Sequence, residues 1–378
     1  MLLKAQVYFI LTLPFWLFFH NGGYSISENI IIIEHKVFIN HPGEKGLVPA
    51  ILVEVKNEEN LPIQYYMDVE SVICLEAVCK VIPVRLFWNN IGAYKKYELK
   101  ARETLEKYEA DLFEPQDYLK LQTILSNSNS PYSEVRLNDV LTVVNASNSD
   151  NVDAVSGATA LVLDDKDTVP GAALTCFTLW HWANNKDIIN QIKKISTLSA
   201  SNAQILEFLE EENLTYYFMG LEALIHRGLY DRLFLDIIHN RVKNENKLIR
   251  PTVDYFETAP SEVYFKCIKE LFIYGEVAQK TAAIKSLQNL ESPISRDYLD
   301  CFSESKLQIE SFQVLSYYLE LMLEKNPNSL KITNYILPLL DENIVIARRV
   351  YWFLEHQQLN ETQQKIVNYF AKNHKEQL

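Results

Sequence analysis

Two different periods of hydrophobic and polar residues divide the chain. Between Ile30 and about Tyr97, β-branched and aromatic residues form short runs separated by turn residues such as His41-Pro42-Gly43. The runs are IIIIEHKVFI, LVPAILVEV, QYYMDV and CKVIPVRLFWN. Short runs of this composition predict the strands of a sheet. One amphipathic helix is expected at DYLKLQTIL, because an acidic, proline-bearing turn precedes it at 114–116.

After about Gly171 the period changes to 3.6 residues and stays helical to the C-terminus. Gly220, Gly228 and Gly275 are the only later glycines, and Gly228 is expected to end a helix. The apolar sets at helical spacing are Leu214, Tyr217, Phe218, Leu221, Leu224 and Ile225; Tyr264, Cys267, Ile268 and Leu271; Phe312, Leu315, Leu319 and Met322; and Ala347, Val350, Tyr351 and Leu354. The predicted fold class is therefore α+β, a β-rich part followed by antiparallel helices.

The C-terminal stretch LPLLDENIVIARRVYWFLEHQQLNETQQKIVNYF resembles a HEAT-type repeat through its acidic turn and the Ala-Arg-Arg of its second helix. No fixed period precedes it. An irregular HEAT-like α-solenoid is the first prediction for this region, with a compact helical bundle as the alternative.

Residues 1–23 have the order of an export signal. Lys4 is the single charge before the apolar run Val7–Phe19, and polar and small residues follow at 20–23. The run contains Pro14 and is shorter than the ~20 residues that a spanning helix needs. We expect a cleaved signal peptide and a periplasmic or extracytoplasmic location. The weak cleavage site leaves an uncleaved membrane anchor as the alternative.

Export changes the interpretation of the cysteines. Cys74 and Cys79 lie between two apolar segments with the pattern of hairpin strands, and in an oxidising compartment such a pair can form a disulfide. Two separate thiols are an equal alternative. The remaining cysteines, Cys176, Cys267 and Cys301, stand singly on apolar faces, where core packing explains them. The spacing of Cys74 and Cys79 offers no second ligand pair for a structural zinc site.

The charge excludes one class of partner. The chain has 49 acidic and 36 basic side chains, for a formal charge of -13. Phosphate binding needs clustered Lys and Arg, so no nucleic-acid partner is expected, and neutral or basic partners are favoured.

The segment VDAVSGATALV carries the most specific motif. Its residues Asp153-x-x-Ser156-Gly157-Ala158-Thr159 match the flavinylation motif of FMN-binding domains, as found in the C subunit of the sodium-pumping quinone reductase and the G subunit of the related Rnf complex. This resemblance implies that an FMN transferase attaches FMN covalently, through a phosphodiester to Thr159. It makes 24–185 an FMN-binding domain and leaves 186–378 as an α-helical, repeat-like domain.

The residue types suit such a modification. Gly157 and Ala158 add little bulk beside the acceptor hydroxyl of Thr159, which another enzyme must reach. Ser156 can close the turn through its hydroxyl, and Asp153 either orients the turn or meets the metal of the transferase. The alternative is an ordinary tight turn without a cofactor.

A weaker resemblance to a divergent, exported branch of the same domains extends over residues 70–185. It rests on a strand ending in Trp88-Asn89, followed by Gly92 and Tyr94. The chain departs from the family after Thr159, where ALVLDDKDTVPG precedes the next helix. This insertion puts the family's flavin pocket in question more than the attachment point.

Aromatic residues near the motif are the candidates for stacking on a flavin ring: Trp88, Tyr94, Phe177, Trp180 and Trp182. Core packing is the favoured interpretation of each. His181 is a candidate proton donor to reduced flavin, although a packed histidine is the commoner case.

Three functions follow, in order of preference. The first is an exported flavoprotein that carries electrons, with the helical domain docking a redox partner protein. The second is a scaffold or interaction protein without flavin. The third is a flavin-dependent oxidoreductase that acts on a small substrate, for which the sequence supplies no catalytic constellation.

Overall fold

A computed structural model describes residues 30–72, 81–107, 111–138, 140, 166–304 and 311–378. Contacts divide the chain into two compact units, Met1–Ala200 and Ser201–Leu378, here called the sheet unit and the helical unit.

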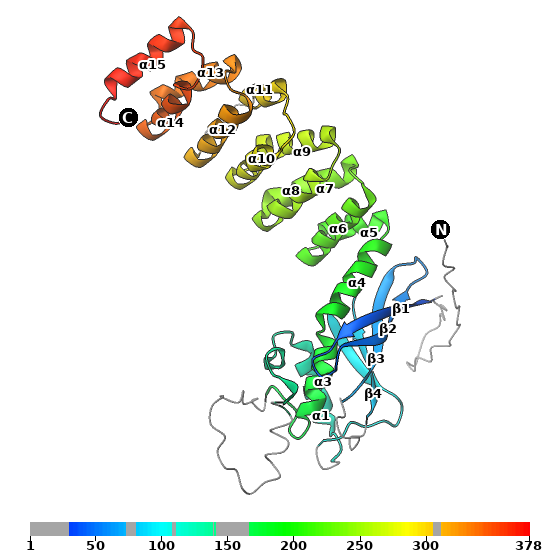
Figure 1. The fold of residues 1–378 in the computed structure, drawn as a ribbon. Coiled ribbons are helices and arrows are strands. Elements are labelled where there is room, and N and C mark those ends of the chain that lie inside the picture. Colours follow the sequence, from blue (N-terminus) through cyan, green and yellow to red (C-terminus); the bar gives the residue numbers. More distant parts are fainter. Residues whose placement is uncertain (1–29, 73–80, 108–110, 139, 141–165, 305–310) are drawn as a thin grey trace, which may run out of the picture. The chain divides into compact units, whose positions relative to one another are not determined.

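The sheet unit is built on an antiparallel meander of five strands in the order β1-β2-β3-β4-β5 (Figure 1). The strands are β1 (Ile31–Asn40), β2 (Leu47–Lys56), β3 (Pro62–Glu70), β4 (Pro83–Trp88) and β5 (Tyr94–Leu99). The predicted apolar runs are therefore strands. Consecutive antiparallel strands need only short turns, which explains the turn residues between the runs.

Alternation along the strands gives the sheet one inner face. On β1, Val37 and Ile39 are buried while Phe38 between them is 65% exposed. The inner face also carries Met67 and Leu86, which are fully buried. The core continues into α1 (Pro115–Ser126), α3 (Ala173–Ala183) and α4 (Lys186–Ser199).

Helix α1 is the one predicted from the acidic turn. Pro115 is its first residue, and Asp117 Oδ2 accepts a hydrogen bond of 2.8 Å from the Glu114 backbone N–H, closing a capping box. Leu121, Ile124 and Leu125 form its buried face. A short 3-10 helix, η2 (Pro131–Ser133), follows.

The helical unit confirms the predicted succession of helices. They are α5 (Asn202–Glu210), α6 (Leu214–Arg227), α7 (Arg232–Asn244), α8 (Ile249–Glu257), α9 (Ser261–Tyr274), α10 (Val277–Asn289), α11 (Arg296–Glu304), α12 (Phe312–Lys325), α13 (Leu330–Ile336), α14 (Ile344–Leu354) and α15 (Glu361–Asn373), with 3-10 turns η3 (Asn246–Leu248) and η4 (Leu337–Asp341). Gly228 ends α6 with a φ of 63°, as expected of a left-handed C-cap.

Packing within the helical unit is local. The even-numbered helices α6, α8, α10, α12 and α14 pack on one another in succession, and helices adjacent in sequence pair beside them (Figure 1). Side chains of later helices cap carbonyls of earlier ones: Gln279 Nε2 donates to Val242 O at 2.9 Å, and Arg349 Nη2 donates to Ser316 O at 3.2 Å. Together the two units give the predicted α+β layout.

The division falls after α4, whereas the sequence pattern places it near residue 185. Helix α4 packs on β1, where the Asn40 backbone N–H donates to Asp187 Oδ2 at 3.0 Å. The Ser196 hydroxyl lies 2.9 Å from the Tyr65 hydroxyl. The 3.6-residue period marks α4 as a helix but does not show that it covers a sheet.

Within the described ranges, no helix combines the length and the apolar character needed to cross a membrane.

Candidate functional site

The flavinylation motif, Asp153, Ser156, Gly157, Ala158 and Thr159, lies outside the described residues. The same is true of the predicted disulfide partners Cys74 and Cys79, and of the predicted signal at 1–23. The structure does describe the segments on either side of the motif.

Both flanking segments are fixed in the sheet unit. Before the motif, Val140 is 2% exposed, and its N–H donates to Arg136 O at 3.3 Å. After the motif, the Tyr132 hydroxyl donates to Thr168 Oγ1 at 2.8 Å, and Val169 is fully buried. The Val169 N–H also points at Cys176 Sγ, 3.5 Å away. The described residues on either side of the motif, Val140 and Thr168, are thus anchored in the core that contains α3.

Helix α3 brings two histidines and three aromatic rings together. The ring of His41, from the turn after β1, stacks on Trp182 with centroids 4.6 Å apart. The His181 ring contacts Phe177 at 4.4 Å, Trp180 at 5.0 Å and His41 at 5.8 Å. We call these five residues the imidazole cluster. Three of the predicted stacking residues, Phe177, Trp180 and Trp182, belong to it.

The surroundings of His41 fix its tautomer. Its Nδ1 accepts a hydrogen bond from the Gly43 N–H at 3.1 Å, so its proton is on Nε2, which donates to Thr178 O at 3.1 Å. A second proton would break the first bond. Burial lowers the pKa of His41 to about 4, although the bond to Thr178 acts in the opposite direction. His41 is therefore a neutral, structural residue at neutral pH.

His181 is neutral for similar reasons. Burial, and then the neighbouring His41, lower its pKa to about 4 against a hydrogen bond to the Tyr132 backbone. Its Nε2 is buried and has no hydrogen-bond partner among the described residues. At neutral pH the ring carries no positive charge, so the structure gives no support to an imidazolium proton donor here.

Four of the five aromatic stacking candidates, Trp88, Phe177, Trp180 and Trp182, are core residues, as the sequence favoured, and Tyr94 is partly buried against that core. Trp88 is fully buried, and its Nε1–H donates to Ala183 O at 2.7 Å. The Trp180 Nε1–H donates to Asn127 O at 2.8 Å, and the Tyr94 hydroxyl donates to Gln122 Oε1 at 2.8 Å. Protein atoms already occupy the hydrogen-bonding ends of these side chains.

The Trp-Asn and Gly-x-Tyr residues have a structural role in the β4–β5 turn. Asn89 Oδ1 accepts from the Ala93 N–H at 2.8 Å, which holds the turn. Gly92 has a φ of +76°, and a Cβ there would lie 2.9 Å from the Ile189 Cα. Only glycine fits both the backbone conformation and the close approach of α4.

A buried ionic network on β2 is not evident from the sequence motifs. Glu54 and Lys56 are 1% and 5% exposed, with Lys56 Nζ 3.4 Å from Glu54 Oε1. His35 Nε2 lies 2.9 Å from Glu54 Oε2, and the Tyr65 hydroxyl donates to Glu54 Oε1 at 3.2 Å. The sequence feature that could have revealed this network is the alternation Leu52-x-Glu54-x-Lys56, which places both charges on the inner face of the sheet.

Burial alone would raise the pKa of Glu54, but the hydrogen bond with His35 and the charge of Lys56 lower it below its ordinary value. The network therefore holds a carboxylate in the ionised form between β1, β2 and β3. It has a cation and two further hydrogen-bonding partners, which makes it a satisfied structural element.

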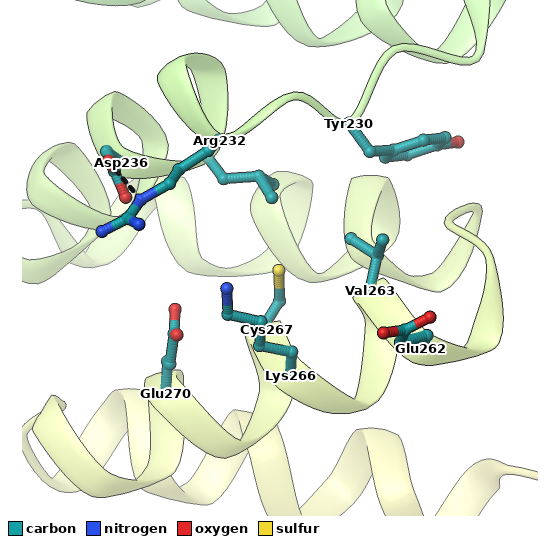
Figure 2. A pocket seen from close by; sticks show the side chains of 9 residues that line it. Tyr230, Arg232, Asp236, Glu262, Val263, Lys266, Cys267 and Glu270 are labelled. Carbon is teal, nitrogen blue, oxygen red and sulfur yellow. Dashed lines mark ion pairs between the residues drawn. The ribbon is translucent and has the colours of Figure 1, made fainter.

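Among the described residues of the helical unit, an open groove of about 300 Å³ lies between α7 and α9 (Figure 2). Its lining is Tyr230, Arg232, Leu235, Asp236, Glu262, Val263, Lys266, Cys267 and Glu270. Sequence periodicity predicted the buried face of α9, including Cys267, but not the charged residues beside it.

No group of three or more His, Cys, Asp or Glu side chains with the arrangement of a metal site occurs in the part of the chain that the structure describes. Comparison with known proteins found no relative: no family model, curated protein or solved structure matches the chain.

Proposed function

We propose that the protein is an exported flavoprotein that carries FMN covalently on Thr159 and takes part in extracytoplasmic electron transfer. The observation that carries this proposal is the motif Asp153-x-x-Ser156-Gly157-Ala158-Thr159. The N-terminal pattern of an export signal supports it, because a free flavin nucleotide would diffuse away outside the cytoplasm, whereas an attached one stays.

The anchoring of Val140 and Thr168, on either side of the motif, in one folded core is compatible with this function. A flavin bound covalently at Thr159 would stay attached to the sheet unit. The Thr159 oxygen would form the bond to the FMN phosphorus, and its proton would leave with the group that the transferase displaces. No ring-stacking residue is assigned to the flavin, since the candidate rings Trp88, Phe177, Trp180 and Trp182 are buried in the core and Tyr94 packs against it.

For the helical unit we propose an irregular HEAT-like solenoid that docks a redox partner protein. The succession of even-numbered helices and the carbonyl caps between neighbouring helices support this interpretation over a compact bundle. Repeat proteins of this kind offer extended surfaces for binding.

The test is flavin fluorescence of the protein in a denaturing gel, after export from cells that contain an FMN transferase. We expect a fluorescent band for the natural chain and none for Thr159→Val. Absence of fluorescence in the natural chain would favour the scaffold function, while steady oxidation of a small substrate without a partner would favour the oxidoreductase.

A further inference from the structure

The groove between α7 and α9 has charges that the protein itself leaves free. Arg232 Nε pairs with Asp236 Oδ2 at 3.5 Å, and His239 Nε2 lies 3.6 Å from Glu270 Oε2. Among the described residues, Glu262 and Lys266 have neither a hydrogen bond nor an ion pair. A negative and a positive charge are thus available, one turn apart on the same face of α9.

The floor of the groove is buried and apolar, and one end is closed by a packed aromatic ring. Leu235 and Cys267 are 9% and 1% exposed. Tyr230 stands at one end, where its hydroxyl donates to Thr258 O at 2.8 Å and its ring stacks on Tyr255 with centroids 5.2 Å apart. Burial raises the pKa of the Cys267 thiol to about 12, so the thiol acts as an apolar surface. In Figure 2 the side chains of α9 point toward those of α7 across this floor.

We propose that this groove binds an extended peptide segment of a partner protein that presents one basic and one acidic side chain two residues apart. Side chains four residues apart on a helix are about 5–6 Å apart at Cβ. Side chains two residues apart in an extended chain project on the same side at about 6.5 Å. The basic side chain of the segment would meet Glu262 and the acidic one Lys266, while the intervening backbone lies over Leu235 and Val263.

This inference rests on the docking role proposed for the helical unit and is independent of the flavin. It is tested on the full chain with fluorescein-labelled peptides of the sequences Gly-Lys-Val-Glu-Gly, Gly-Lys-Val-Lys-Gly and Gly-Glu-Val-Glu-Gly, by fluorescence anisotropy. We expect the mixed-charge peptide to bind about fivefold more tightly than either like-charge peptide, as one exposed ion pair provides. Equal binding of the three peptides, or no binding of any, would overturn the proposal.

Variants with a reversed charge provide the second part of the peptide-binding test. Lys266→Glu makes both of the free charges that α9 places in the groove negative, so the preference is expected to move to Gly-Lys-Val-Lys-Gly. Lys365→Glu makes the same change on the exposed surface of α15, and it should keep the natural preference. Identical behaviour of the two variants would contradict the proposal. Repeating the measurement in Thr159→Val separates the two ideas, because loss of flavin should leave peptide binding unchanged.

Discussion

Hydrogen bonds within the sheet unit and within the helical unit join residues at very different separations along the chain. In the sheet unit, the bonds Trp88–Ala183, Tyr65–Ser196 and His41–Thr178 join residues 95, 131 and 137 positions apart. In the helical unit, Arg241–Glu210 and Gln279–Val242 join residues 31 and 37 positions apart. The sheet unit is closed by its last helices, whereas the helical unit is a succession of neighbours. A destabilising substitution should therefore weaken the whole sheet unit, whereas in the helical unit its effect should stay with the neighbouring helices.

The largest effect is expected in the buried network of the sheet unit. Glu54→Leu leaves the Lys56 ammonium buried without its counter-charge, so the free energy of unfolding should fall by about 3–5 kcal/mol. Denaturant titration measures the loss, and hydrogen exchange should show it throughout the sheet unit.

The matched control is the double variant Glu54→Leu, Lys56→Met. An apolar pair of similar volume should recover most of the stability, since a buried ion pair often contributes little net free energy. A double variant no more stable than the single one would show that packing, and not the uncompensated charge, determines the loss.

The second largest effect is expected from acid, which should destabilise the sheet unit. The pKa of His41 is lowered to about 4, so between pH 6.5 and 4 the unfolded chain binds a proton that the folded chain does not. The contribution of His41 is therefore full above pH 6.5 and falls by about 3 kcal/mol as the pH decreases to 4. His181, whose pKa is also lowered to about 4, adds a loss of the same sign in this pH range. Glu54, whose pKa is lowered, contributes stability that is lost as the pH falls below the ordinary pKa of a glutamate. The free energy of unfolding of His41→Gln, measured by denaturant titration, should fall less steeply between pH 6.5 and 4 than that of the natural chain. An unchanged slope would show that His41 does not contribute to the loss of stability in acid.

A smaller loss is expected where α4 touches the β4–β5 turn. Gly92→Ala should destabilise the sheet unit by about 2 kcal/mol, through its positive φ and the contact with Ile189. Gly46→Ala is the control, because Gly46 has a φ of +89° but no atom within 4 Å of an added Cβ. Equal losses in the two variants would mean that the approach of α4 has no energetic consequence.

The smallest effect tests the local character of the helical unit. The Tyr217 hydroxyl lies 2.8 Å from Thr252 Oγ1 between α6 and α8, and Tyr217→Phe should cost about 1 kcal/mol. Hydrogen exchange should accelerate in α6 and α8 and stay unchanged in α12 to α15. Faster exchange along the whole helical unit would show that it unfolds as one body.

The same contrast explains what the sequence could predict. Strands and helices follow from local periods, so the runs before Tyr97 and the helices after Gly171 are correctly assigned. The attachment of α4 to the sheet depends on contacts such as Tyr65–Ser196, between residues far apart in the chain, and no local pattern contains them. The inward positions of Glu54 and Lys56 conflict with hydropathy, and their mutual pairing, with the hydrogen bonds to Glu54 from its neighbours on β1 and β3, makes them tolerable.

The candidate site divides in the same way. The motif ending at Thr159 is recognised by residue identity, and its chemical role stays a prediction. The imidazole cluster could not be predicted, because His41 and His181 meet only after the chain between them folds. The free charges Glu262 and Lys266 are ordinary surface residues until the groove brings them beside Leu235.

The most direct test of the central claim is the intact mass of the exported protein, made in cells where the FMN transferase labels a known flavoprotein. The attachment predicts a mass higher than that of the unmodified chain by FMN less one water, with the addition on the peptide that contains Thr159 and absent from Thr159→Val. The mass of an unmodified Thr159 chain from the same cells would contradict the claim.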